Sequence, residues 1–217
     1  MLAKGVRTDK KHIAASFEPF TRVSLVYYEK VKSDTHLLSE VQILDSQAFV
    51  RSRLDRLSYA SYLTDLVDTF FGIYDPHPEV FNLLAEAFQL FKNTCPVNIV
   101  SVFEVKLLEQ IGWLPVLTQC VVCGSGDLER AFFSPKQGGV LCAKCDRSEK
   151  RTVPLSAQAI RTLIAFLKEE FEEAVKVKLD LQTERELERV IRRFIEFRLE
   201  YPLRSSRFLS EIRSVLQ

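Results

Sequence analysis

The apolar positions of this chain change their spacing once, early along the sequence, and this change separates a β part from a helical part. Between residues 17 and 31, Val23, Leu25 and Tyr27 fall on alternate positions, which is the period of a strand with one buried face. After a turn, residues 37–44 have the pattern of a returning strand. The first part is therefore predicted to be an antiparallel β unit, which two strands alone would leave marginally stable.

Beyond Asp45 and Ser46, which can cap a helix, apolar residues recur at every third or fourth position, as on the buried face of a helix. Ser156, and a capping box formed by Thr183 with Glu186, are expected to start two of the helices. Residues 175–181 are expected to be irregular or strand-like. The predicted helices span residues 47–71, 79–91, 96–111, 156–171, 183–201 and 206–216.

The composition agrees with a globular, mainly helical protein of the α+β class. The chain has 217 residues, of which 47% are hydrophobic, with 7 glycines and 8 prolines. This length suffices for one large domain or two modest ones. No apolar run approaches the roughly 20 residues that cross a bilayer, and the sequence starts at Met1 without a secretion signal. We therefore expect a cytoplasmic protein with no membrane partner.

Two cysteine pairs form the most specific motif in the chain. Cys120 and Cys123 are followed, after eighteen intervening residues, by Cys142 and Cys145. Pairs with this spacing supply four thiolates that can surround one tetrahedral metal ion, usually Zn²⁺. Because a site of four cysteines leaves no coordination position for water or substrate, the expected cofactor is one zinc ion with a structural role.

The surrounding residues predict a small zinc ribbon. Gly124, Gly126, Gly138 and Gly139 are expected to supply the positive backbone φ angles that tight turns beside the cysteine pairs require. Short strands at residues 131–133 and 139–141 would then bring the two pairs together, while residues 144–154 are expected to be a charged connector.

Two disulfides or an iron–sulfur cluster are the alternatives to zinc at these four cysteines. A reducing compartment disfavours the disulfides. The fifth cysteine, Cys95, stands alone before Pro96 and is expected to be a small packing residue.

The net charge is only +1, but the charges are unevenly distributed. Residues 1–32 carry seven basic and three acidic side chains, an excess of four positive charges. Basic side chains neutralise phosphates and aromatic side chains stack on bases, which is how small β-barrels hold single-stranded nucleic acid. The aromatic candidates in this region have an equally good interpretation as core residues, and they are Phe17, Phe20, Tyr27 and Tyr28.

A second group of basic residues lies near the C-terminus, diluted by Glu196 and Glu200. A solvated helix face is the favoured interpretation of this group. Its members are Arg192, Arg193, Arg198, Arg204 and Arg207.

No catalytic motif is present in the sequence. The chain lacks a phosphate-binding glycine loop, a Walker motif and a Gly-x-Ser-x-Gly elbow. Its three histidines, His12, His36 and His77, do not have the spacing of a metal site or a catalytic triad. Asp65 and Asp68 could share a helix face, but a solvated face explains them better. The sequence therefore predicts a protein that is not an enzyme.

The order of several short segments resembles the bacterial RecO family of DNA repair and recombination proteins. The resemblance covers nearly the whole chain and includes the four-cysteine region with Gly138 and Gly139. The matching segments are residues 2–7, 17–20, 27–28, 57–63, 103–108, 112–115, 133–135 and 203–209.

The resemblance implies an N-terminal OB-fold and a helical domain with an inserted zinc module. The expected domains are residues 1–46, which bind DNA, and residues 47–217, interrupted by the zinc module at 116–150. Family members have further strands before the segment 3–5, so the resemblance implies that this chain carries only part of the OB-fold.

The resemblance also implies a recombination mediator that binds single- and double-stranded DNA, anneals complementary strands and works with RecR. In the family, such a protein engages the single-stranded-DNA-binding protein and helps to load RecA onto strands coated by it, in association with the bacterial nucleoid. The alternative function is a helical protein-interaction scaffold with a structural zinc and only incidental DNA binding.

Site residues are carried over from the family only where this sequence matches it. The four cysteines are implied to be metal ligands, and Lys4 and Arg7 are implied to contact DNA. Lys10, Lys11 and Arg22 join them as DNA-binding candidates because they add to the positive charge of the same region.

Overall fold

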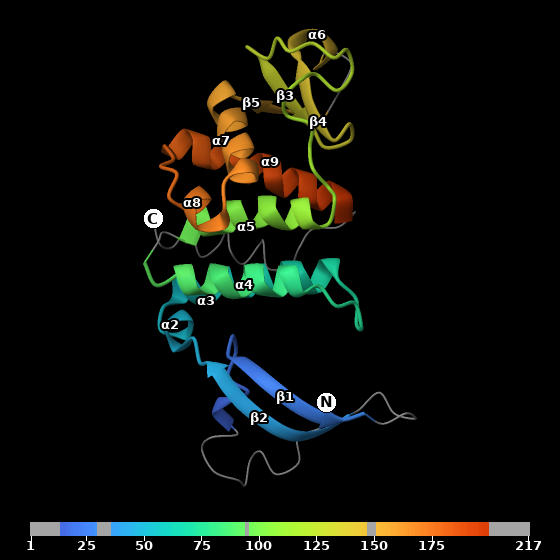
Figure 1. Ribbon diagram of the computed structural model, residues 1–217. Coiled ribbons are helices and arrows are strands. Elements are labelled where there is room, and N and C mark those ends of the chain that lie inside the picture. The colour runs from blue at the N-terminus through green and yellow to red at the C-terminus, as the bar shows by residue number, and fades with distance from the viewer. Residues whose placement is uncertain (1–13, 30–35, 94–95, 147–150, 200–217) are drawn as a thin grey trace.

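A computed structural model of the protein describes residues 14–29, 36–93, 96–146 and 151–199. The chain forms successive layers, from a β hairpin at one end, through helices, to a small sheet at the other end (Figure 1). The helices are, in chain order, α2 (Ala48–Arg51), α3 (Leu54–Phe70), α4 (Pro78–Leu90), α5 (Pro96–Gln110), α6 (Ala143–Asp146), α7 (Ala157–Lys168), α8 (Phe171–Val175) and α9 (Leu181–Leu199). The strands are β1 (Arg22–Tyr28), β2 (Leu37–Asp45), β3 (Ala131–Ser134), β4 (Gly139–Cys142) and β5 (Val153–Leu155).

The N-terminal hairpin confirms the predicted antiparallel pair. β1 and β2 pair from Arg22 opposite Asp45 to Tyr28 opposite Leu37, with two irregularities in register. The expectation of one buried face is wrong, because no residue of either strand is buried. Tyr27 and Tyr28 are 46% and 66% exposed. Their aromatic rings are therefore available at the surface of the hairpin.

The hairpin is attached to the helical body along a short seam. Phe20 packs edge-on against Phe88 of α4, with 5.5 Å between the ring centroids. The guanidinium of Arg51 donates hydrogen bonds to the carbonyl oxygens of Pro19 (2.6 Å) and Ser46 (2.9 Å). These contacts fix the base of the hairpin, and a hydrogen bond of 3.0 Å between Nε2 of His36, directly before β2, and the Tyr74 hydroxyl links its other end to the loop between α3 and α4.

The first predicted helix is divided in the structure. Arg53 is extended (φ −138°, ψ 135°), which ends α2 and lets α3 start in a new direction. Asp45 accepts a hydrogen bond from the backbone N–H of Gln47 (3.0 Å) instead of capping one long helix. The remainder agrees with the prediction, since α3 buries Tyr59, Leu63 and Leu66 in the core.

Helix α5 lies at the centre of the helical body. It contacts α3 and α4 on one side and α7, α8 and α9 on the other. Ile99, Phe103 and Leu107 of α5 are fully buried in one continuous core. The helices before and after the cysteine region therefore pack together around one core.

The start of α7 agrees with the prediction, whereas the start of α9 differs from it. Ser156 caps α7 as expected, since its hydroxyl accepts a hydrogen bond from the N–H of Ala159 (3.1 Å). The expected capping box of Thr183 is wrong, because Asp180 is the residue that accepts from the Thr183 N–H (2.8 Å). Glu186 accepts instead from the backbone N–H of Ser156 (2.9 Å), which ties α9 to α7.

The segment between these helices also corrects the prediction. α7 ends at Lys168, and residues 171–175 form the separate helix α8 instead of continuing α7. Residues 176–180 are irregular, which was one of the two forms expected for this segment, and not strand-like. The predicted helix at residues 206–216, together with His12 and Cys95, lies outside the described residues.

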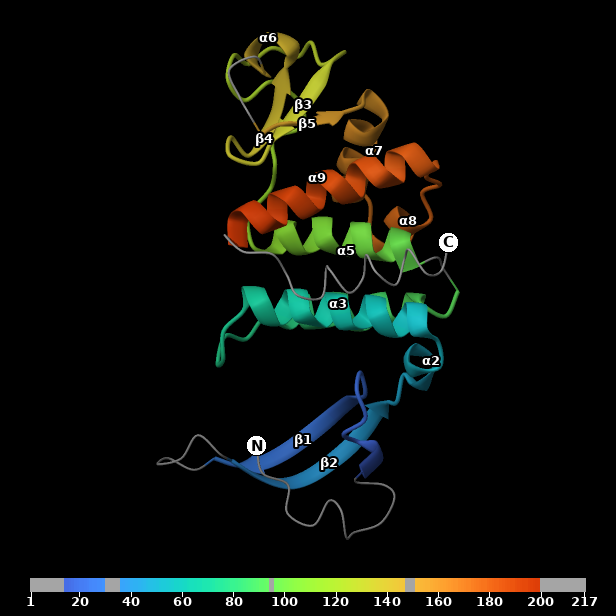
Figure 2. The same ribbon diagram turned by 180° about the vertical axis from the view of Figure 1, so that it is seen from behind.

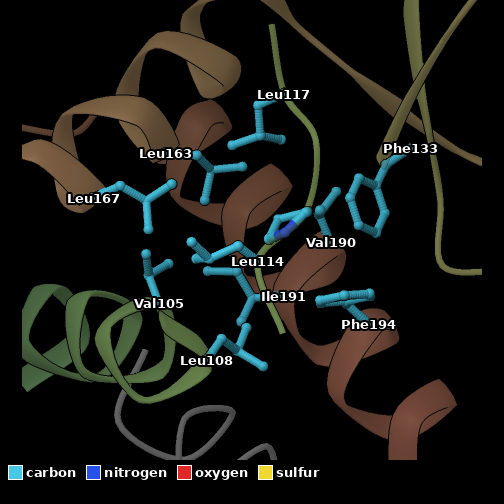
Figure 3. A pocket seen from close by; sticks show the side chains of 11 residues that line it. Val105, Leu108, Leu114, Leu117, Phe133, Leu163, Leu167, Val190, Ile191 and Phe194 are labelled. Atoms are coloured by element: carbon cyan, nitrogen blue, oxygen red, sulfur yellow. The ribbon is translucent and has the colours of Figure 1, made fainter. Parts of the chain in front are cut away.

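A small gap of ≈ 20 Å³ lies where α5, α7 and α9 meet β3 and the linker after α5 (Figure 3). All the side chains that line it are apolar, among them Leu108, Phe133 and Phe194. A buried water needs two to four polar partners, so a gap of this kind is a packing space and not a ligand site.

Among the described residues, no helix has both the length and the apolar character needed to cross a membrane.

Candidate metal centre

The four-cysteine region folds as a small three-stranded sheet. β3 pairs with β4 from Ala131 opposite Cys142 to Ser134 opposite Gly139, which confirms the predicted hairpin. β5 pairs with the other edge of β3, in the order β4-β3-β5, although Val153 and Pro154 are expected from the sequence to end a connector. The third strand ties the inserted region to α7, which starts directly after β5.

The sheet and the preceding turn bring all four sulfur atoms together. The Sγ atoms of Cys120, Cys123, Cys142 and Cys145 lie within 4.8 Å of one another. The Sγ atoms of Cys123 and Cys142 are 3.8 Å apart. A tetrahedral zinc ion with Zn–S bonds of about 2.3 Å places its ligands about 3.8 Å apart, so the cluster has the dimensions of a four-thiolate metal site.

Backbone hydrogen bonds shape the turn that carries the first pair. The N–H of Gly124 donates to the carbonyl of Cys120 (2.8 Å), and the N–H of Cys120 donates to the carbonyl of Ser125 (2.8 Å). Gly124 has φ 72°, as predicted, whereas Gly126 needs no positive φ. Cys120 is buried and Cys123 is exposed, so the cluster lies at the edge of the sheet.

The two glycines before the second pair have different roles. Gly138 has φ 71° and supplies the turn between β3 and β4, as predicted. Gly139 does not have a positive φ; it allows a close approach of the chain, because Val116 pairs alongside it in a parallel bridge. A Cβ atom at position 139 would lie 2.5 Å from the carbonyl oxygen of Val116 and 2.6 Å from Cγ1 of Val121.

We therefore expect Gly139→Ala to lower the stability of the cysteine region by about 1 to 3 kcal/mol, because the backbone at Val116 must move to admit the methyl group. The measurement is thermal unfolding together with the metal content of the purified variant. Gly126→Ala is the matched control, since a Cβ there meets nothing within 4 Å. Equal stability of the two variants would contradict the role given to Gly139.

The electrostatics of the cluster favour a cation. Burial raises the pKa of the Cys120 thiol, but backbone N–H groups of Cys142, Cys123 and Val122 stabilise its thiolate and bring its pKa down to about 6. The N–H of Cys145 similarly lowers the pKa of Cys142. A hydrogen bond with Cys123, burial and the negative charge of Cys120 raise the pKa of Cys145 to about 12. Four thiolates therefore need a positive ion to be formed together, and the cluster can hold a metal ion.

Aromatic side chains join the cysteine region to the helical body. Phe133 of β3 is fully buried and packs edge-on against Phe194 of α9, with 5.5 Å between the centroids. The guanidinium of Arg198 lies over both Phe194 (5.0 Å) and Trp113 (5.6 Å). The sequence pattern does not predict this contact between the cysteine region and the helical body, since it favours a solvated helix face for Arg198.

Of the DNA-binding candidates, the structure describes Arg22, which lies in the hairpin at the other end of the molecule from the cysteine cluster. Lys4, Arg7, Lys10 and Lys11 lie outside the described residues. Arg22 starts β1, is exposed, and places its guanidinium 5.4 Å from the ring centre of Phe81 in α4. The structure therefore does not bring Arg22 near the cysteine cluster.

Comparisons with known proteins assign the chain to a family. The family model described as "Recombination protein O C terminal" matches residues 51–207. The chain belongs to the RecO family. Proteins named DNA repair protein RecO match almost all of it. The protein from Symbiobacterium thermophilum is 31% identical over 98% of this chain and 85% of its own length. The protein from Bacillus velezensis is 30% identical over 99% of this chain and 84% of its own length.

Proposed function

We propose that this RecO family member is a recombination mediator in DNA repair, which acts by binding and bringing together DNA strands without covalent chemistry. Family membership carries this proposal, since the curated relatives that match nearly the whole chain are named DNA repair protein RecO. The proposed domains are residues 1–46 as part of an OB-fold and residues 47–217 as the helical domain, with the zinc module at 116–150. The protein would act in the cytoplasm, on the bacterial nucleoid.

The cysteine cluster is proposed to hold one Zn²⁺ ion with a structural role. The ligands would be Cys120, Cys123, Cys142 and Cys145, whose spacing in the structure supports a tetrahedral thiolate site. The ion would supply the positive charge that the four thiolates require and would leave no coordination position for a substrate. Its contribution is therefore to the folding of the module, not to a reaction.

The first DNA-binding surface is proposed to be the N-terminal β unit. Lys4, Arg7, Lys10, Lys11 and Arg22 would neutralise phosphates of single- and double-stranded DNA. The exposure of Tyr27 and Tyr28 supports this proposal, because exposed rings on a small sheet can stack on unpaired bases. Annealing would follow when two strands are held by the same molecule.

RecR, the single-stranded-DNA-binding protein and RecA are the proposed protein partners, with RecA engaged indirectly.

Binding of an oligonucleotide across a range of salt concentrations tests this function. We expect the logarithm of the affinity to fall linearly with the logarithm of salt, by about 0.7 per neutralised phosphate on a single strand. Changing Lys4, Arg7, Lys10 and Lys11 to Ala should reduce this slope by nearly 3, because four charges are removed. Fluorescence anisotropy of a labelled single strand gives both the affinity and the slope.

A control with the same loss of charge uses exposed basic residues elsewhere, changed to Ala together: Arg130, Lys136, Lys168 and Lys178. This control should keep the slope of the parent protein. If the parent protein does not bind oligonucleotides even at low salt, the proposed function is wrong.

The alternative, a protein-interaction scaffold, is favoured by one observation. Ile73 and Tyr74, in the loop between α3 and α4, are 90% and 78% exposed, and exposed apolar groups of this kind serve protein contacts. Under this alternative the change of the four N-terminal basic residues to Ala would barely alter DNA binding. The same titration therefore separates the two functions.

A further inference from the structure

The outer face of α9 carries a row of arginines at a constant spacing. Arg185, Arg189 and Arg193 are all exposed and follow one another at intervals of four residues. The opposite face of the helix is buried, through residues such as Leu187, Ile191 and Phe194. In the view from behind, α9 runs across the surface of the helical body (Figure 2). The row is therefore presented to solvent along the helix.

These three guanidinium groups are not used to hold the fold. None of them forms a hydrogen bond or ion pair in the part of the chain that the structure describes, whereas the neighbouring Arg192 binds Glu188 at 2.8 Å. Arg189 contributes only a through-space charge that helps to lower the pKa of Glu186, whose carboxylate is bound to the backbone of Ser156. Glu196 lies on the same face and offsets one of the three positive charges, so the net charge of the row stays positive.

The geometry of the row suits a string of phosphates. Four residues of helix advance about 6 Å and turn about 40°, so the three arginines span roughly 12 Å in a gently winding line. A DNA strand presents one phosphate per 3.4 Å of duplex axis, so this line covers about three or four phosphates. Guanidinium groups bind phosphate oxygens through two parallel hydrogen bonds, which favours Arg at such contacts.

An aromatic residue continues the same series. Phe197 follows Arg193 by four residues and is 48% exposed, so its ring lies next along the row. A ring beside a line of cations offers a stacking surface to a base. The occupant indicated by this combination is therefore a nucleic acid strand.

We infer that the α9 row formed by Arg185, Arg189, Arg193 and Phe197 is a second DNA-binding surface, separate from the N-terminal β unit. This inference rests on the proposed DNA-binding function and adds to it a second site. In both ribbon views the layer of α3 and α4 lies between the hairpin and α9 (Figures 1 and 2). One chain would then hold two strands at once on two sides of its helical body, which raises the local concentration of each strand near the other.

The test is the combined variant Arg185→Gln, Arg189→Gln and Arg193→Gln in the full chain. Glutamine keeps the helix propensity of arginine, so the fold should be unchanged by circular dichroism. At 0.1 M salt, each removed contact should weaken binding of a labelled single strand of about 15 nucleotides at the α9 surface roughly fivefold, or on the order of 100-fold at that surface for all three, while binding at the N-terminal β unit is retained. The slope of the salt dependence of this second binding step should fall by about 2. The stoichiometry at saturation should fall from two strands per chain to one.

Two further variants make the result specific. Arg130→Gln, Lys168→Gln and Lys178→Gln remove the same charge from other exposed positions and should retain the affinity and the stoichiometry of the parent. Replacement of the three α9 arginines by Lys should restore most of the salt slope, because the charge returns.

The outcomes separate this inference from the proposed function. If the parent protein binds DNA and the α9 variant binds it with unchanged slope and stoichiometry, the α9 surface is not a DNA site, while the proposed function stands. If the variant instead loses only the binding of an oligoglutamate peptide, the row belongs to an acidic protein partner and the inference is overturned. If the parent binds no DNA, the proposed function itself fails.

Discussion

Replacing Cys142 by Ser is expected to abolish stoichiometric metal binding and to lower the midpoint of thermal unfolding. Cys142 contributes one of four sulfur atoms that lie within 4.8 Å of one another, and it is buried against Cys120 and Leu141. In zinc-finger peptides the binding free energy of a structural zinc is about 10 to 16 kcal/mol, and most of it is folding free energy. A three-stranded sheet with strands this short buries too little to hold its fold without the ion.

Metal analysis of the purified variant, followed by a thermal melt, measures both parts of this expectation. Cys95→Ser serves as the control and should keep one ion per chain, because Cys95 is not part of the cysteine pairs. DNA affinity should change little in the Cys142 variant, since the proposed DNA surfaces do not include the cluster. An unchanged metal content in the Cys142 variant would show that the four sulfurs do not form the site.

Truncating Phe194 to Ala is the second change with a large expected effect, at about 3 to 5 kcal/mol of unfolding free energy. Its ring is 1% exposed, packs edge-on against Phe133 and lies beneath the guanidinium of Arg198. It also lines the gap of ≈ 20 Å³ between α5, α7 and α9, so its removal enlarges a space that is already incompletely filled. The melting temperature should fall by roughly 6 to 20 °C for a chain of this size.

Phe197→Ala on the same helix is the matched control. Its side chain is 48% exposed, so its loss should cost less than about 1 kcal/mol. The comparison measures how strongly the cysteine module is held to the helical body, because Phe133 and Phe194 belong to the two different parts. Equal destabilisation by the two substitutions would mean that the Phe133–Phe194 contact is not the joint between them.

The local pattern of the sequence predicted the features that depend only on nearby residues. Pro78 and Pro96 start α4 and α5 within a residue of the predicted positions, and Ser156 caps α7 as expected. The spacing of the cysteines predicted a cluster of four sulfurs, since two tight turns and one hairpin are enough to bring the pairs together. These features follow from helix periodicity, capping and turn geometry, all of which act within a few residues.

Features that depend on distant neighbours were not predictable in this way. β5 is only three residues long and forms because the free edge of β3 offers it hydrogen-bonding groups. Asp180 caps α9, and the Glu186 side chain accepts a hydrogen bond from the Ser156 N–H of another element. Gly139 is required by the passage of Val116, which is remote from it in sequence.

The sequence by itself determined the periods of the strands and helices, the set of four clustered cysteines and, through its order of segments, the family. The tertiary structure alone decided which surfaces stay in solvent. The aromatic residues of β1 and the arginines of α9 have the same local pattern whether or not another element covers them. Only the packing of α9 on α5 and α7, and the projection of the hairpin from α3 and α4, leaves them exposed, because burial is a property of contacts between distant segments.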